Sequence, residues 1–77
     1  MTKAVYLITP DDVRVPAARM AAEDLIDLGS QVASYFARHR RLNRGVSYDA
    51  QIGDTEGAIT QSGLRKPLTF TIAKDAR

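Results

Sequence analysis

The chain has no cysteine and a single histidine among its 77 residues. Without cysteine it can form no disulfide and offers no thiolate to a metal, so disulfide-rich secreted scaffolds are excluded and a reducing cytoplasm is the expected compartment. No uncharged stretch approaches the roughly 20 apolar residues that a membrane-spanning helix needs. The first residues, MTKAVYLITP, contain too short an apolar run for a signal peptide. We therefore expect a soluble, cytoplasmic protein with no membrane contact.

Motifs that carry catalysis or bind metals are also missing. His39 is the only imidazole, and no carboxylate stands three or four residues away to orient it as a general base. One histidine without cysteine provides no zinc site, and the segment DAQIGDTEG lacks the ligand pattern of a calcium loop. The glycines of GDTEG are not followed by the Lys and Ser/Thr of a phosphate-binding loop. We expect no catalytic residue, no metal, no cofactor and no enzymatic activity, and we assign His39 to packing.

Three segments have the pattern of β-strands, and a fourth is weaker. The run 3–8, KAVYLI, is almost wholly apolar, which is typical of a strand in the interior of a sheet. The segments 46–52 and 67–74 alternate apolar and polar residues, as half-buried strands do. A short strand over 58–62 completes a meander, although turn residues flank it on both sides.

One long helix is predicted between the first and second strands. From Pro16 to Leu42, a rotation of 100° per residue places most apolar side chains in a single arc. The register continues through Gly29, which favours a continuous or mildly kinked helix. A helix of this length would be about 39 Å long, whereas the strands are only about 20 to 27 Å long. Either Gly29 breaks the helix, or one end of it overhangs the sheet.

The predicted fold class is therefore α+β, with a single domain over residues 1–77. The long helix packs on one face of a small sheet of three or four mainly antiparallel strands, in the order β-α-β-(β)-β. A chain of this size builds only a small core, which dimerisation would help to stabilise.

Positive charge is concentrated where the predicted helix ends. Residues 38–44 contain four arginines and no acidic residue, although the net charge of the whole chain is only +2. In a meander, the turn at 63–67 returns to the start of the strand that follows the helix, and this brings two further cations to the arginines. We call the six residues the basic edge: Arg38, Arg40, Arg41, Arg44, Arg65 and Lys66. The same reasoning sends four acids to the opposite edge: Asp11, Asp12, Asp54 and Glu56.

Two interpretations of the basic edge stay open. Basic residues near a helix C-terminus stabilise the helix dipole by roughly 0.3 to 1 kcal/mol each, so the cluster could be a solvated helix end. Arginine also pairs with phosphate or carboxylate through two parallel hydrogen bonds, which suits an acidic protein surface, a nucleoprotein complex or a nucleic-acid backbone. Two apolar residues, Met20 and Ile26, fall outside the apolar arc of the helix. Isolated exposed apolar residues are common on protein surfaces, and a contact with a partner or a second copy is the alternative explanation.

In size and element order, the chain resembles the small phage-encoded inhibitors of host defence, of which the anti-CRISPR proteins are one kind. The resemblance covers the whole chain and no residue motif carries it, so no functional residue is transferred. It implies a protein that blocks a CRISPR effector. Three functions stay open. The first is an inhibitor or adaptor that docks through the basic edge, and the alternatives are a direct sequence-tolerant nucleic-acid binder and a small structural or regulatory homodimer.

Overall fold

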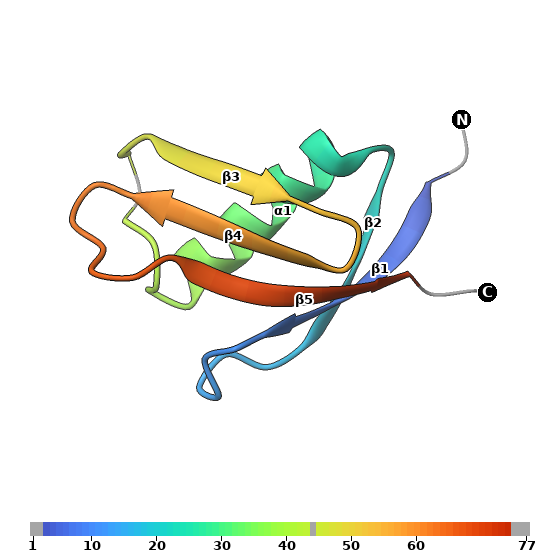
Figure 1. Cartoon of the computed structure of the whole chain (residues 1–77), viewed down its shortest axis with the longest axis horizontal. Helices are drawn as coiled ribbons and strands as arrows, with labels where there is room; N and C mark the ends of the chain where they lie inside the picture. The colour runs from blue at the N-terminus through green and yellow to red at the C-terminus, as the bar shows by residue number, and fades with distance from the viewer. Residues whose placement is uncertain (1–2, 44, 75–77) are drawn as a thin grey trace.

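The computed structural model describes residues 3–43 and 45–74, and this part of the chain contains one helix and five strands. It confirms the α+β class and shows more strands than the three or four predicted (Figure 1). The elements in chain order are β1 (Ala4–Pro10), β2 (Ala18–Ala22), α1 (Leu25–Arg38), β3 (Tyr48–Ile52), β4 (Glu56–Gln61) and β5 (Leu68–Lys74).

The strands form one sheet in the order β2-β1-β5-β4-β3, in which each neighbouring pair is antiparallel. β1 lies between β2 and β5, which is the interior position predicted for the first apolar run. β3, β4 and β5 form the predicted meander, and β4 includes most of the weak strand predicted over 58–62. The two edge strands are therefore β2 and β3.

The prediction of one helix from Pro16 to Leu42 is wrong in its first part, where the chain forms β2. In the antiparallel pair with β1, Ile8 lies opposite Ala18 and Val5 lies opposite Ala21. Side chains of β2 alternate, so that Met20 is 8% exposed whereas its neighbour Arg19 lies on the surface. The sequence ARMAA has high helix propensity, and pairing with β1 overrides that preference.

The helix begins at Leu25 because Asp24 and Asp27 together cap its first turn. The carboxylate of Asp24 accepts a hydrogen bond from the backbone N–H of Asp27 at 2.7 Å, and the carboxylate of Asp27 accepts one from the N–H of Glu23 at 3.2 Å. These bonds satisfy donors that have no partner inside the helix. α1 then continues through Gly29 for 14 residues, about 21 Å, which matches the length of the strands.

The helix ends at Arg38 in a Schellman motif rather than continuing to Leu42. The N–H of Arg41 donates to the carbonyl of Phe36 at 2.9 Å, and the N–H of Arg40 donates to the carbonyl of Ala37 at 3.1 Å. This motif needs one residue in the left-handed region, and Arg40 takes that place with φ of 60°. Glycine usually occupies this position because any Cβ atom is crowded there.

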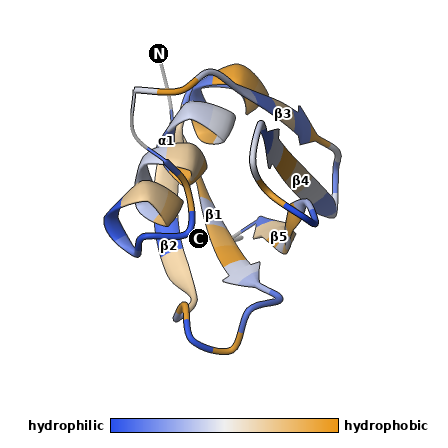
Figure 2. Cartoon of the chain, turned by 90° about the vertical axis from the view of Figure 1, so that its left-hand side faces the viewer, coloured by the Kyte–Doolittle hydropathy of each residue, from blue (hydrophilic) through white to orange (hydrophobic). Residues whose placement is uncertain are grey.

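The sheet curls around α1, so that both edge strands contact the helix (Figures 1 and 2). Phe36 of α1 and Phe70 of β5 lie at the centre of the core with ring centroids 6.0 Å apart. A Cβ atom at Gly57 would lie 2.6 Å from the ring of Phe70, so only glycine lets the ring lie against β4. The buried apolar residues are Ile8, Val15, Met20, Ala22, Leu28, Val32, Ala33, Phe36, Leu42, Ile59, Phe70 and Ile72.

Candidate binding surface

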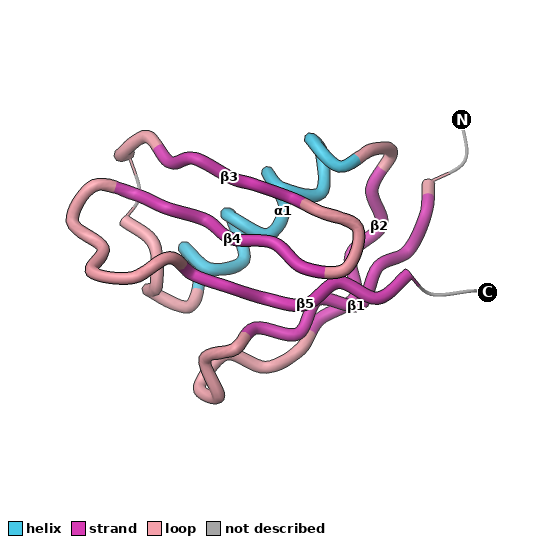
Figure 3. Tube along the Cα trace, viewed as in Figure 1, coloured by secondary structure: helices cyan, strands magenta, loops and turns pink. Residues whose placement is uncertain are grey.

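The segment after α1 and the turn between β4 and β5 are joined at one end of the molecule by Gln61. Its side-chain oxygen accepts from the N–H of Asn43 at 2.8 Å, and its side-chain nitrogen donates to the carbonyls of Asn43 and Val46 at 2.8 and 3.1 Å. Gln61 is only 8% exposed, so these bonds are shielded from water. The amide therefore fastens the segment after α1 to the end of β4, where the β4–β5 turn begins. Figure 3 shows the loops that flank α1 and β4 at the same end of the molecule.

Five of the six residues of the basic edge belong to these two loops or to the last turn of α1, and the sixth, Arg44, lies outside the described residues. Four of the five are exposed: Arg38, Arg40, Arg65 and Lys66. The fifth, Arg41, is half-buried. Figure 2 looks onto this end of the molecule, where the chain is hydrophilic directly after α1, over residues 39–41.

Tyr35 anchors the last turn of α1 beside Arg38. Its hydroxyl donates to the carbonyl of Pro16 at 2.6 Å, which ties the helix to the loop between β1 and β2. The guanidinium carbon of Arg38 lies 5.9 Å from the centre of the Tyr35 ring, a cation–π distance. The ring of His39 packs edge-on against the same tyrosine at 4.6 Å.

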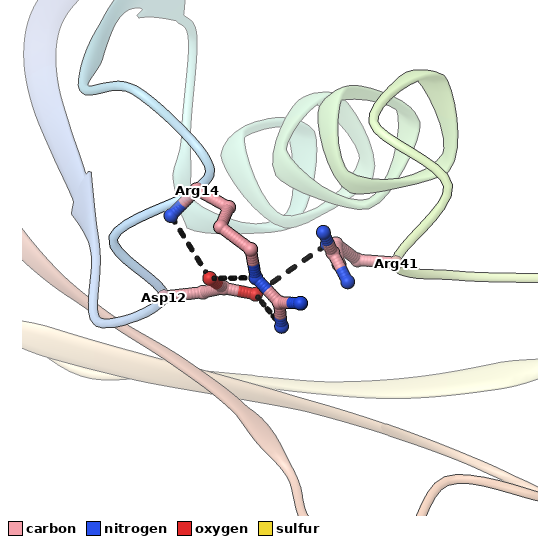
Figure 4. Close-up of polar contacts among 3 residues, drawn as sticks. All are labelled: Asp12, Arg14 and Arg41. Atoms are coloured by element: carbon pink, nitrogen blue, oxygen red, sulfur yellow. Dashed lines mark hydrogen bonds and ion pairs between the residues drawn. The ribbon is translucent and has the colours of Figure 1, made fainter.

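Asp12 lies between two arginines, one of them Arg41 of the basic edge, in contrast to the prediction that Asp12 would lie at the opposite edge (Figure 4). Its Oδ1 accepts hydrogen bonds from the backbone N–H and Nε of Arg14, at 3.0 and 3.1 Å. Its Oδ2 lies 3.4 Å from Nε of Arg41. Among the described residues, the buried Nε of Arg41 has no hydrogen-bond acceptor. The contact between Asp12 and Arg41 is therefore an ion pair and not a hydrogen bond.

These contacts change the protonation equilibria of the loop. The side-chain hydrogen bond from Arg14 is the largest of the effects that lower the pKa of Asp12 below its ordinary value, and the charge of Arg41 contributes less. The same hydrogen bond raises the pKa of Arg14. Asp12 is therefore a carboxylate at neutral pH, and Arg41 is partly neutralised within the molecule.

The predicted opposite edge of four acids is wrong for two of them. The N–H of Asp11 donates to the carbonyl of Thr69 at 3.0 Å, and the carboxylate of Asp11 accepts from the hydroxyl of the same threonine. Because β1 runs antiparallel to β5, with Pro10 opposite Phe70, the end of β1 lies beside the start of β5. Asp11 and Asp12 consequently lie near the basic edge. Sequence reasoning also missed the pairing of Arg14 with Asp12. The available signal was the position of Arg14 two residues after Asp12 in a turn, where its side chain can reach the carboxylate.

The two apolar residues singled out from the sequence have different environments. Met20 is 8% exposed and belongs to the core, so its prediction as a contact residue is wrong, because β2 is a strand whose alternation turns it inward. Ile26, in the first turn of α1, is 86% exposed.

The arrangement at this end can attract and orient anions, and it offers hydrogen-bond donors of the arginine type. Residues 3–43 and 45–74 hold no group of three or more His, Cys, Asp or Glu side chains placed for a metal ion. Within the same residues, α1 lacks the length and apolar character of a bilayer-crossing helix.

Comparison of the chain with protein-family models, with curated proteins and with solved structures finds no match in any of the three.

Proposed function

We propose that this chain is a non-enzymatic binding protein of the cytoplasm, an inhibitor or adaptor that docks through its basic edge onto an acidic protein surface or a nucleoprotein complex. In the anti-CRISPR-like form of the proposal, the target is a CRISPR effector, which must present a surface for nucleic acid or an acidic surface nearby. The observation that carries the proposal is the exposure of four cationic side chains on the last turn of α1 and the two loops that Gln61 joins.

The backbone of Arg40 supports a role for its charge. Arginine occupies a left-handed position with φ of 60° that glycine would take without strain. Its side chain is exposed and so contributes little to the core. Because Arg40 strains the backbone and adds no packing, we attribute its presence to a contact that its charge makes outside the chain.

The buried Gln61 amide gives the site a fixed geometry. Side chains on unsupported loops lose conformational freedom when they bind, which weakens the complex. Here the loops are held together by three hydrogen bonds from one side chain, and Arg38 lies close to the ring of a tyrosine that is itself bonded to Pro16. The cations are therefore partly preorganised for a partner.

The test is inhibition of purified CRISPR effector complexes, measured as loss of target-duplex binding in a gel-shift assay. We expect the wild-type chain to inhibit at least one effector of a panel, and the double variant Arg40→Glu/Arg65→Glu to lose that inhibition. The matched control is Lys3→Glu/Lys74→Glu, which changes the net charge equally at residues outside the basic edge and should inhibit like the wild type. Each exposed charge contributes less than about 1 kcal/mol to folding, so both variants should remain folded.

Three results would contradict the proposal or change it. Failure to inhibit any effector removes the anti-CRISPR-like form, and equal loss in both double variants removes the basic edge as the site. Binding of duplex DNA by the chain alone, with affinity falling by about 0.9 log unit per log unit of salt for each phosphate contacted, would replace it with direct nucleic-acid binding.

A further inference from the structure

An apolar groove runs between α1 and the edge strand β3, on a part of the surface distinct from most of the basic edge. It consists of two adjoining hollows of about 300 and 400 Å³, both lined by Tyr48. One lies against the start of the helix and includes Leu25 and Ile26, and the other lies against its end and includes Arg38 and Val46. Of the five large apolar side chains that are exposed in the described chain, four line this groove, and Val13 is the exception.

The outer edge of β3 provides hydrogen-bonding groups beside the groove. Gly53, directly after β3, donates its N–H to the carbonyl of Glu56, and the carbonyl of Asp49 accepts from the hydroxyl of Thr60 on β4. The odd-numbered residues of β3 therefore point their backbone groups toward β4. Successive residues of a strand point these groups to opposite edges. Tyr48, Ala50 and Ile52 therefore direct their N–H and C=O groups away from β4, where another strand can pair with them.

We propose that this face binds a second copy of the same chain, through antiparallel pairing of the two β3 strands about a two-fold axis at Ala50. This register uses all five residues of the strand, with Tyr48 opposite Ile52 of the other copy. The single charged residue of the strand, Asp49, then lies opposite the uncharged Gln51. Pairing centred on Asp49 would instead place two carboxylates opposite each other, which is destabilising.

Charge along the groove also favours a second copy reversed by a two-fold axis. The end of the groove at Leu25 and Ile26 adjoins the exposed acids Glu23 and Asp24, whereas the other end is lined by Arg38. A two-fold axis brings the acidic end of each copy toward the basic end of the other, so the groove is complementary to itself. The same rotation carries each exposed Ile26 toward the hollow around Val46 of its partner.

A standard interface takes about 800 Å² from each partner, which is about a seventh of the 5454 Å² that the chain exposes, so a dimer of standard size would cover a substantial fraction of this small chain. Pairing would extend the sheet across the two copies and cover four of the exposed apolar side chains. The interface shares Arg38 with the basic edge, whereas Arg40, Arg65 and Lys66 do not line the groove and stay free to bind another partner.

The test is sedimentation equilibrium of the full chain over a range of concentrations. We expect a species of twice the 8.5 kDa chain mass, and self-association weakened at least tenfold, about 1.4 kcal/mol, by Ile26→Lys, which puts an ammonium into the apolar contact. The matched control is Val13→Lys, the same type of change at a side chain that is 96% exposed and lies outside the groove. It should associate like the wild type.

A register test uses the absence of native cysteine. Across the proposed axis the two Ala50 Cα atoms are about 5.5 Å apart, within the range that a disulfide spans, so Ala50→Cys should form a covalent dimer on mild oxidation. The two cysteines introduced by Asp49→Cys would have Cα atoms more than about 7 Å apart, so they should not form a disulfide. A wild-type chain that stays a single copy at about 1 mM, equal effects of Ile26→Lys and Val13→Lys, or equal cross-linking of both cysteine variants would overturn the proposal.

Discussion

The two edge strands of the sheet contact the same helix in different ways. On the β2 side, Gln31 of α1 donates to the carbonyl of Ala21 at 2.7 Å and Tyr35 bonds to Pro16. On the β3 side, the helix approaches through carbon contacts, and a Cβ atom at Gly29 would lie 3.3 Å from Ile52. On the β2 side, hydrogen bonds cross from the helix and a hollow of about 320 Å³ is lined by polar residues such as Gln31 and Ser34 as well as apolar ones, whereas the groove on the β3 side is mainly apolar. The first side is held by directional bonds within the chain, and the second, among the described residues, by apolar contacts alone.

The largest effect should come from removing core volume on the β2 side. Met20→Ala empties a buried site and should lower the free energy of unfolding by about 2 to 5 kcal/mol. Ile26→Ala, on the open β3 side, should change it by less than about 0.5 kcal/mol when the chain is dilute enough to be a single copy. Urea denaturation followed by circular dichroism measures both. Equal losses for the two variants would show that the edges do not differ as described.

A smaller effect is expected from the hydrogen bond that closes the β2 side. Tyr35→Phe keeps the ring beside Arg38 and removes only the donor to the Pro16 carbonyl. The loss should be about 0.5 to 1.5 kcal/mol of unfolding free energy. Hydrogen exchange of the amides in β2 should rise more than that of the amides in β3. An equal rise in both strands would contradict a local role for this bond.

The smallest effect concerns the ionic contacts that join the β1–β2 loop to the end of the helix. Because the pKa of Asp12 is lowered in the folded chain, mainly by the hydrogen bond from Arg14, its contribution to stability is present above the unfolded pKa of about 3.9 and is lost as the pH falls through the lower folded value. Asp12→Asn should remove this part of the acid sensitivity. Urea midpoints at neutral and acidic pH measure it, and an unchanged pH dependence in the variant would assign the sensitivity to other carboxylates.

The sequence predicted the α+β class and the meander, because 46–52 and 67–74 alternate clearly between apolar and polar residues. It predicted the interior position of the first strand because 3–8 is almost wholly apolar. It failed over 18–24, where residues such as Met20 and Ala21 fit a helical arc as well as a strand. Their strand state depends on pairing with β1, a tertiary effect that local propensity does not contain. The capping pair Asp24 and Asp27 was the available signal that the helix begins later.

For the candidate site, the sequence located the cations but not their neighbours. It placed Arg41 and the 63–67 turn at one end of the meander, and the Asn43–Gln61 bonds bring those loops together. It missed Asp12 because the position of the β1–β2 loop depends on the pairing of β1 with β5, which are separated by more than fifty residues. Contacts of that kind follow from sheet order, and a hydrophobic pattern does not specify sheet order.

The position of β5 has a consequence for how the molecule folds. The hairpins β1–β2 and β3–β4 have no strand pairing with each other, and β5 lies between them as the strand that bonds to both. Isolated two-stranded hairpins are at best marginally stable in water. Pairing of residues 68–74 with both hairpins is therefore the step that completes the sheet. Before β5 pairs, the two hairpins are only marginally stable, and we expect cooperative unfolding to begin when β5 separates from them.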